Sequence, residues 1–378
     1  MWRLLRSSTL ETRPAAFALI IGLICPWPVP SRAADGFPWE IRRIEGRDHV
    51  TTDRIAEFYQ LDKHPGRWAY SAGKKSLGFR PGSREVEING LKHWLGFPAV
   101  EHDGGLWVSR IDLSKTIEPS LRPAMVRGLA VPATVVLDPG HGGRDKGAIG
   151  TYQYEKNFAL DLARRVRDRL VKAGVKVALT RNADEFVELH DRAAFANRIP
   201  RSIFVSIHFN TGTNRAANGF EIFSITPRGA PSTEAEDMSL RDLVKEPGNA
   251  HDEVSFLLAK SIYHAMHGRL QMADRGMKRA RFAVLRLTAS PSVLVEGGFL
   301  INPQDARRIA SPKWRDTLAG AIADGILAYI ALAAKGEPPP LAADYRSGLA
   351  RPPAPPLPQP PSASPSPSPP AVQLRPLG

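Results

Sequence analysis

The stretch Thr134-Val-Val-Leu-Asp-Pro-Gly-His141 decides how this chain folds. Its first four residues are apolar or β-branched, and Asp-Pro-Gly follows at once, which is typical of a buried strand that ends in a loop. The histidine then lies at the carboxyl end of the strand. Open α/β sheets bind their ligands at that edge. The stretch therefore predicts a sheet that presents His141 to a ligand.

Three further residues that can bind a metal lie at the ends of predicted elements. Glu155 directly precedes an amphipathic helix, whereas His208 and Glu296 each end an apolar run. Singly, each has an ordinary explanation, such as a polar strand end or a carboxylate that complements the positive end of a helix. Together, two histidines and two glutamates suit a catalytic zinc, which needs three protein ligands, an open position and a carboxylate as acid/base.

Glycines beside two of these residues strengthen the functional interpretation. His141 lies in Gly-His-Gly-Gly, and Glu296 is followed by Gly297 and Gly298. Glycine lets the backbone approach a bound group closely. Asp138 is expected either to brace the loop that carries His141 or to be a plain turn residue.

Strands and helices alternate from about residue 133 to residue 334. One buried helix face is marked by apolar residues repeated every four positions: Phe158, Leu162, Val166 and Leu170. The other predicted helices cover residues 189–198, 253–270 and 314–334, and the predicted strands cover residues 135–137, 175–179, 203–207, 220–225, 282–285 and 293–295. This order predicts an α/β fold with a twisted, mostly parallel sheet and helices on both faces.

The amino terminus is typical of an export signal. Arginines precede the apolar run Ala15–Ile24, which is too short to span a bilayer, and Ser31-Arg-Ala33 is a small-x-small cleavage pattern. Residues 1–33 are therefore predicted to be a cleaved signal peptide, so that the mature form has no transmembrane segment. Cys25, the sole cysteine, is lost with it, and a zinc site must use histidine and carboxylate ligands.

The charge indicates which partners to expect. The net charge is +13, and removing residues 1–33 takes away four arginines and one glutamate, which leaves about +10. A basic exported protein meets anionic wall polymers and lipid surfaces. The chain lacks the aromatic-interleaved basic motif of a nucleic-acid module, so nucleic acid is not an expected partner.

Composition divides the rest of the chain. Residues 36–120 are predicted to form a small α+β domain with a hairpin turn at Asn89-Gly90, and residues 121–132 a linker. The pattern Val-x-Ile-Asn-Gly … Gly-x-Leu-Trp-Val resembles the domain named after the amino terminus of copper amine oxidases. Residues 336–378, rich in Pro, Ser and Ala, are predicted to be a disordered tail.

The block from Val135 to Tyr329, within a predicted catalytic domain of residues 133–334, resembles the zinc-dependent N-acetylmuramoyl-L-alanine amidases of amidase type 3, whose fold is phosphorylase/hydrolase-like. The matching segments follow in order: Leu137-Asp-Pro-Gly-His-Gly-Gly-Arg-Asp-Lys-Gly-Ala-Ile-Gly, Glu155-Lys-Asn, Leu179-Thr-Arg, Val205-Ser-Ile-His-Phe-Asn, Asp274-Arg-Gly-Met-Lys and Pro291-Ser-Val-Leu-Val-Glu-Gly-Gly-Phe-Leu-Ile-Asn. The resemblance implies that His141, Glu155 and His208 bind Zn²⁺ and that Glu296 is catalytic. It also implies that the substrate is peptidoglycan, cut between N-acetylmuramic acid and L-alanine.

The resemblance further implies a periplasmic or cell-wall location and a role in wall remodelling or daughter-cell separation. Residues 227–252 form a polar insert, expected to be a flexible loop; the alternative is an autoinhibitory lid that an activator protein displaces. Three other functions stay open: a zinc carboxypeptidase, a non-catalytic wall-binding protein and, least favoured, a nucleic-acid binder.

Overall fold

The computed structural model describes residues 39–336 and Tyr345. The predicted signal peptide lies outside the described residues, as does the predicted tail apart from Gly336 and Tyr345. The domain boundaries drawn from the sequence stay a prediction.

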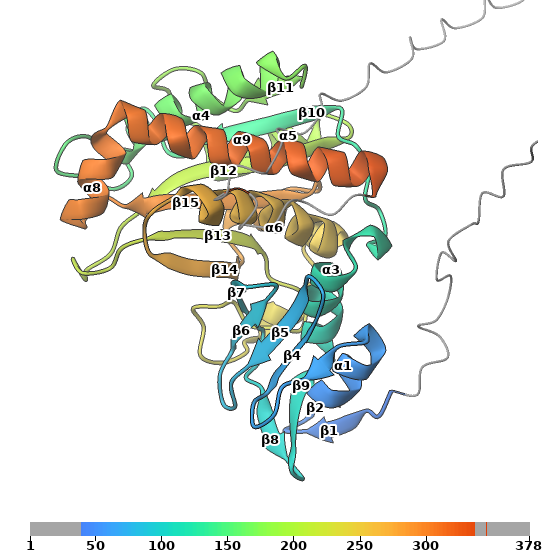
Figure 1. The fold of residues 1–378 in the computed structure, drawn as a ribbon. Helices are drawn as coiled ribbons and strands as arrows, with labels where there is room; N and C mark the ends of the chain where they lie inside the picture. Colours follow the sequence, from blue (N-terminus) through green and yellow to red (C-terminus); the bar gives the residue numbers. More distant parts are fainter. Residues whose placement is uncertain (1–38, 337–344, 346–378) are drawn as a thin grey trace, which may run out of the picture. The chain divides into compact units, whose positions relative to one another are not determined.

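The carboxyl-terminal part is built on a mixed sheet. Strands β11 (Val177–Leu179), β10 (Thr134–Pro139), β12 (Ser202–Asn210) and β15 (Ser292–Phe299) lie side by side in that order and run parallel (Figure 1). Next come β13 (Phe220–Ile225), antiparallel to β15, and β14 (Asp274–Ala280), parallel to β13. The predicted, mostly parallel α/β sheet is therefore confirmed, with a reversal between β15 and β13.

Helices cover both faces of this sheet. Side chains alternate between the two faces of a strand, so each face has its own apolar cluster. On one face, α4 (Glu155–Lys172), α6 (Asp252–Arg269) and α9 (Pro312–Lys335) share a cluster with Val135 and Val205. On the other, α5 (Leu189–Asn197) and α7 (Ala283–Leu287) share one with Val136 and Phe204. The short helix α8 (Pro303–Ala310) connects β15 to α9.

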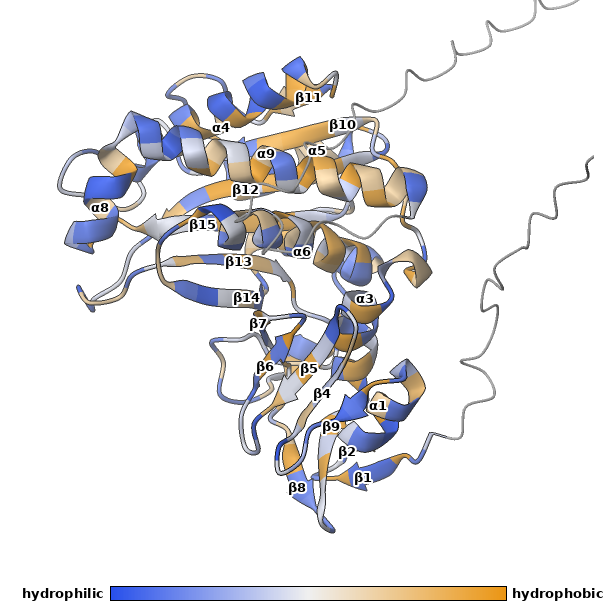
Figure 2. Ribbon diagram, viewed as in Figure 1, coloured by the Kyte–Doolittle hydropathy of each residue, from blue (hydrophilic) through white to orange (hydrophobic). Residues whose placement is uncertain are grey.

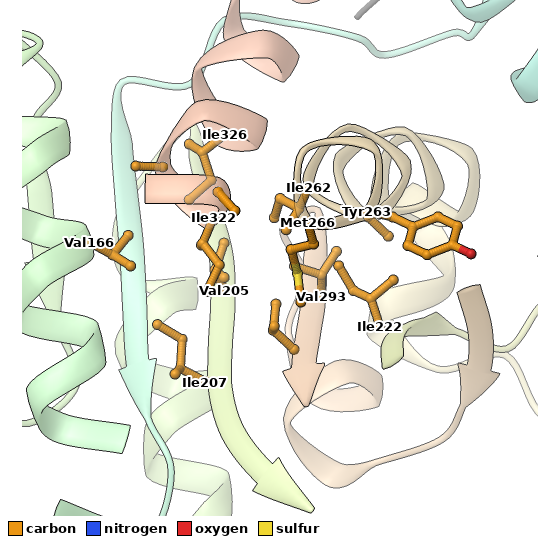
Figure 3. Packing of buried hydrophobic residues seen from close by; sticks show 14 of the residues in the cluster. Val166, Val205, Ile207, Ile222, Ile262, Tyr263, Met266, Val293, Ile322 and Ile326 are labelled. Atoms are coloured by element: carbon orange, nitrogen blue, oxygen red, sulfur yellow. The ribbon is translucent and has the colours of Figure 1, made fainter. Parts of the chain in front are cut away.

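The larger cluster fixes α6 and α9 against the sheet. Figure 3 shows Ile262 and Met266 of α6 and Ile322 and Ile326 of α9 directed at the strands. These four side chains are 0% exposed. Strand β10 is hydrophobic along its length in Figure 2, as expected for a strand buried on both faces.

Helix α9 is long and apolar enough to cross a membrane, alone among the described helices. However, 72% of its most apolar window is buried within the protein, where it packs on α4 and α6. Its hydrophobicity is therefore explained by its place in the core.

The tight packing of α9 on α6 allows a test of the fold. A Cβ at Gly325 would lie 2.3 Å from Ile262 Cα. Because Ile262 Cα is a backbone atom, this overlap could be relieved only if α6 moved away from α9. Gly325→Ala is expected to lower the free energy of unfolding by about 2–3 kcal/mol in urea titrations. Gly320→Ala, on the same helix, meets only the tips of two arginine side chains, the nearer at 3.4 Å, and should raise the free energy of unfolding by about 0.5–1 kcal/mol. Equal effects of the two changes would contradict this packing.

Residues 39–121 fold into short strands and helices. The strands are β1 (Arg42–Ile44), β2 (Arg47–Thr51), β3 (Asp62–Lys63), β4 (Ala69–Ala72), β5 (Lys75–Phe79), β6 (Glu85–Ile88), β7 (Leu91–Trp94), β8 (Val100–His102) and β9 (Gly105–Ser109). The helices are α1 (Thr52–Tyr59), α2 (Arg110–Asp112), η1 (Leu113–Ile117) and α3 (Glu118–Leu121). The predicted hairpin is confirmed: Asn89 and Gly90 join β6 to β7, both with positive φ.

This part is attached to the larger sheet. Strands β3 to β7 form an antiparallel meander, and β7 meets β14 through the pair His93 and Met277. The buried Lys260 of α6 donates to the Ser120 carbonyl oxygen at 2.6 Å. Burial lowers the pKa of Lys260 to about 7, so this amine loses its charge far more readily than an exposed lysine does.

One predicted strand is wrong. Phe282 caps helix α7, residues 283–285 lie within it, and the strand beside β13 is β14. A four-residue apolar run does not distinguish a strand from a buried helical turn. Strand β14 was missed because it carries Lys278 and Arg279, whose charges are buried among hydrogen-bonding partners.

Candidate metal centre

Three of the predicted site residues converge at the carboxyl edge of the sheet. His141 follows β10, Glu155 begins α4, and His208 lies near the end of β12. One ligand atom from each lies within 4.8 Å of the others. His141 Nε2 is 3.1 Å from Glu155 Oε2, and His208 Nδ1 is 2.8 Å from Glu155 Oε1. The predicted proximity of the three side chains is confirmed.

The donor set fits zinc. Ligand atoms at about 2.0–2.1 Å from a tetrahedral Zn²⁺ are roughly 3.3 Å apart, and one ligand atom from each of the three side chains already lies within 4.8 Å of the others. Asp145 Oδ2 accepts a hydrogen bond from His141 Nδ1 at 2.8 Å, which leaves Nε2 of that ring to face a metal. Asp145 is not among the site residues predicted from the sequence, although it follows His141 by only four residues.

Glu155 is held by backbone groups on both carboxylate oxygens. Ala148 N donates to Oε2 at 2.9 Å, and Phe209 N donates to Oε1 at 3.1 Å. Burial alone would raise the pKa of Glu155, but hydrogen bonds and charge from His141 and His208 lower it below its ordinary value. The carboxylate is thus kept in the ionised form that binds a cation.

His141 is the nearest imidazole to Glu155 Oε2, at 3.1 Å. Burial opposes its charge, but the hydrogen bonds and charges of Glu155 and Asp145 prevail and raise the pKa of the imidazole. Its backbone has φ +59°, which is uncommon for a residue other than glycine and is often found at functional sites.

Close backbone approach explains the glycine that precedes His141. A Cβ at Gly140 would lie 2.2 Å from His208 Cε1. Because Glu155 holds the His208 ring, the ring cannot move aside without leaving the ligand set. Gly140→Ala is therefore expected to weaken metal binding by about 10- to 100-fold in a competition titration. Gly212→Ala, with open space around its Cβ, is the matched control and should bind as the unchanged protein does. Unchanged affinity in Gly140→Ala would contradict the assigned ligand set.

Asp138 braces the histidine loop through an arginine. It is 0% exposed and accepts hydrogen bonds from Ser206, Thr180 and Arg192. Arg192 also donates to the His141 carbonyl oxygen at 2.7 Å. The bracing alternative for Asp138 is thus supported over that of a plain turn residue.

Glu296 lies beside the three converging side chains. On β15 it is level with His208 on β12, so both point to the same face of the sheet. Burial, followed by the charges of Glu155 and Glu221, raises the pKa of Glu296 well above its ordinary value. Its Oε2 atom is buried and has no hydrogen-bond partner among the described residues. Because an unpaired buried carboxyl oxygen is costly, Glu296 Oε2 is well suited to form a hydrogen bond with a water molecule or a substrate.

Three further histidines lie outside this cluster. His190 and His267 lie apart from it: His190 is exposed beside Asp191, and His267 bonds Asp274 at 2.9 Å. His264 is 1% exposed within α6, a helix with buried residues on all sides.

The insert at residues 227–252 does not lie over the site. Because β13 runs antiparallel to β15, its first residues adjoin Glu296 and its end adjoins Val293. The insert follows that far end, and Arg84 binds the carbonyl oxygens of Ser232 and Thr233 there. The lid alternative is contradicted by this position.

Comparisons with known proteins agree on one family. The family described as N-acetylmuramoyl-L-alanine amidase matches residues 135–328. The amidase AmiA of Escherichia coli (strain K12) is 34% identical over 223 residues, which cover 52% of this chain and 75% of that protein. AmiC of Escherichia coli O6:H1 is 32% identical over 245 residues, covering 58% of each chain. The solved amidase AmiC2 of Nostoc punctiforme is 34% identical with a TM-score of 0.44, covering 52% of this chain and 96% of that one. The chain therefore belongs to the N-acetylmuramoyl-L-alanine amidase family.

Proposed function

We propose that this protein is a zinc-dependent hydrolase of the amide bond between N-acetylmuramic acid and L-alanine in peptidoglycan. The observation that carries the proposal is the convergence of His141, Glu155 and His208, with Glu296 on the next strand. The first three are proposed to hold the metal, and Glu296 to act on the substrate.

The chemistry requires a nucleophile, a stabilised oxyanion and a protonated leaving group. Zinc bound by this ligand set would acidify a water to a pKa of ~7 and polarise the amide carbonyl. Glu296 accepts the proton of the attacking water and returns it to the departing nitrogen of L-alanine. Its unsatisfied, buried Oε2 supports this role, because a carboxyl group that is not engaged elsewhere is able to accept and release a proton.

The cellular setting also belongs to the proposal. Amidases of the wall act outside the cytoplasm, which agrees with the export signal predicted for residues 1–33. The net charge of about +10 that is left without residues 1–33 suits an anionic wall polymer. Wall remodelling or daughter-cell separation is the expected process. An activator protein stays a predicted partner. It would not act by displacing residues 227–252, because that insert does not lie over the site.

Digestion of purified peptidoglycan tests the proposal. The protein without residues 1–33 is expected to release stem peptides with a free L-alanine amino group. A chelator should stop the release, and zinc should restore it. Shortened stem peptides would instead indicate the carboxypeptidase alternative, and wall binding without any product would indicate the binding-protein alternative.

A further inference from the structure

A row of polar side chains extends from the metal centre across the sheet. His208 on β12 is level with Glu296 on β15, and Glu296 is level with Glu221 on β13. Residues that are level on neighbouring strands point to the same face. Beyond them, Arg275 and Lys278 of β14 lie 2.9 and 2.8 Å from Glu221 Oε2. The row thus ends at a cationic position two strands from Glu296.

Glu221 serves as the anchor of this row. It is 3% exposed, and both of its oxygens are engaged. Asn210 donates to Oε1, and Arg275 and Lys278 contact Oε2. With its oxygens occupied, Glu221 fixes the groups around it and is not itself available to a substrate.

Arg275 differs from the rest of the row because part of it is free. About a third of its side chain (35%) is exposed. Its Nε donates to Glu221, and its guanidinium lies 4.9 Å from the centre of the Phe299 ring. Its Nη1 and Nη2 atoms have no hydrogen-bond partner within the described part of the chain. Glu221 and the Phe299 ring fix the orientation of the guanidinium, while Nη1 and Nη2 remain able to donate hydrogen bonds. A guanidinium in this state is preorganised to bind a carboxylate.

The position of Arg275 matches a carboxylate of the stem peptide. Two strand spacings separate β15 from β14, about 10 Å. In a stem peptide the second residue is a γ-linked D-glutamate, and its α-carboxylate lies roughly 7 Å along an extended chain from the bond to be cut. The difference of about 3 Å is less than the length of an arginine side chain, so the two estimates are compatible.

We propose that Arg275 binds the free α-carboxylate of this second stem residue and makes the enzyme prefer substrates in which that group is not amidated. This inference rests on the proposed amidase function. It assigns a specificity role to Asp274-Arg-Gly-Met-Lys278, a matching segment that supplies none of the proposed metal ligands or catalytic groups.

Two synthetic N-acetylmuramoyl tetrapeptides test the proposal. They differ only at the second residue, D-isoglutamate in one and D-isoglutamine in the other. The zinc-loaded protein should have a kcat/KM about 10- to 100-fold higher for the acid, mainly through KM. In Arg275→Met the ratio of acid to amide should fall to about one. Arg275→Lys keeps the positive charge but loses the paired N–H donors of the guanidinium, so its ratio of acid to amide should be intermediate.

Arg286→Met is the matched control. Arg286 has a similar exposure (37%), pairs with Glu246 and lies on α7, near the opposite end of β15, so the preference should persist in this variant. Zinc content and melting temperature establish that each variant is folded. If Arg275→Met does not fold, the ratio in Arg275→Lys decides.

Each outcome of this experiment bears on the proposal. No preference in the unchanged protein, or a preference that survives in Arg275→Met, would overturn the role of Arg275 while leaving the amidase function intact. Cleavage of neither substrate by the zinc-loaded protein would contradict the proposed function itself, and this inference would fall with it.

Discussion

Glu296→Gln is expected to abolish hydrolysis of peptidoglycan while leaving the metal in place. The amide is nearly isosteric with the acid but does not carry a proton between water and the leaving nitrogen. Loss of a general acid/base lowers the rate by roughly 10²- to 10⁴-fold. Because Glu296 is not one of the three converging ligands, zinc content should stay at that of the unchanged protein. The measurements are kcat on a defined muropeptide and zinc by atomic absorption.

The control for this variant is Glu87→Gln, which makes the same change at an exposed position of β6 and should keep full activity. Full turnover by zinc-loaded Glu296→Gln would remove Glu296 from the mechanism. Loss of zinc together with activity would instead make it a ligand.

His208→Ala is expected to remove both the metal and the activity. Imidazole loss leaves two protein ligands, and zinc affinity should fall by more than the roughly 10- to 100-fold typical of changes outside the ligand set. The same change also leaves the Glu155 carboxylate, 4% exposed, without one of its hydrogen-bond donors. A buried carboxylate that loses a partner is destabilising, so the melting temperature should fall as well.

His190→Ala provides the comparison, since His190 is exposed on α5 and lies apart from the ligand set. Zinc content and activity should both be unchanged in it. Normal zinc binding by His208→Ala would contradict the assignment of the metal centre.

Much of the catalytic part could be predicted because its signals are local. The run Thr134–Pro139 is a strand because apolar, β-branched residues end in a loop-forming Asp-Pro-Gly, and His141 follows that strand wherever the sheet is placed. Parallel strands bring their carboxyl ends to one edge, and His208 therefore meets His141. The four-residue repeat from Phe158 likewise identifies the buried face of α4.

The parts that could not be predicted depend on contacts between distant segments. Strand β14 has a charged sequence, and Lys278 is buried because Glu221, on another strand, and Glu234, in the insert, pair with it. The closeness of Glu221 and Glu296 depends on the reversal between β13 and β15, which no local pattern encodes. The same reversal carries the insert away from the site. The pairing of β7 with β14 joins segments about 180 residues apart in the sequence. The periodicity of apolar residues within either segment therefore does not predict that the two strands pair.

Hydrolysis in water enriched in oxygen-18 tests the central claim most directly, because it marks the acyl group at which the bond is cut. In amide hydrolysis the oxygen of water is added to the acyl carbon, and the amine receives only a proton. The account predicts one heavy oxygen in the lactyl carboxylate of the N-acetylmuramic acid product and none in a stem peptide that begins with a free L-alanine amine. Heavy oxygen in a peptide carboxylate would show that a peptide bond is cut instead, and would contradict the assignment of this protein as an amidase acting on that bond.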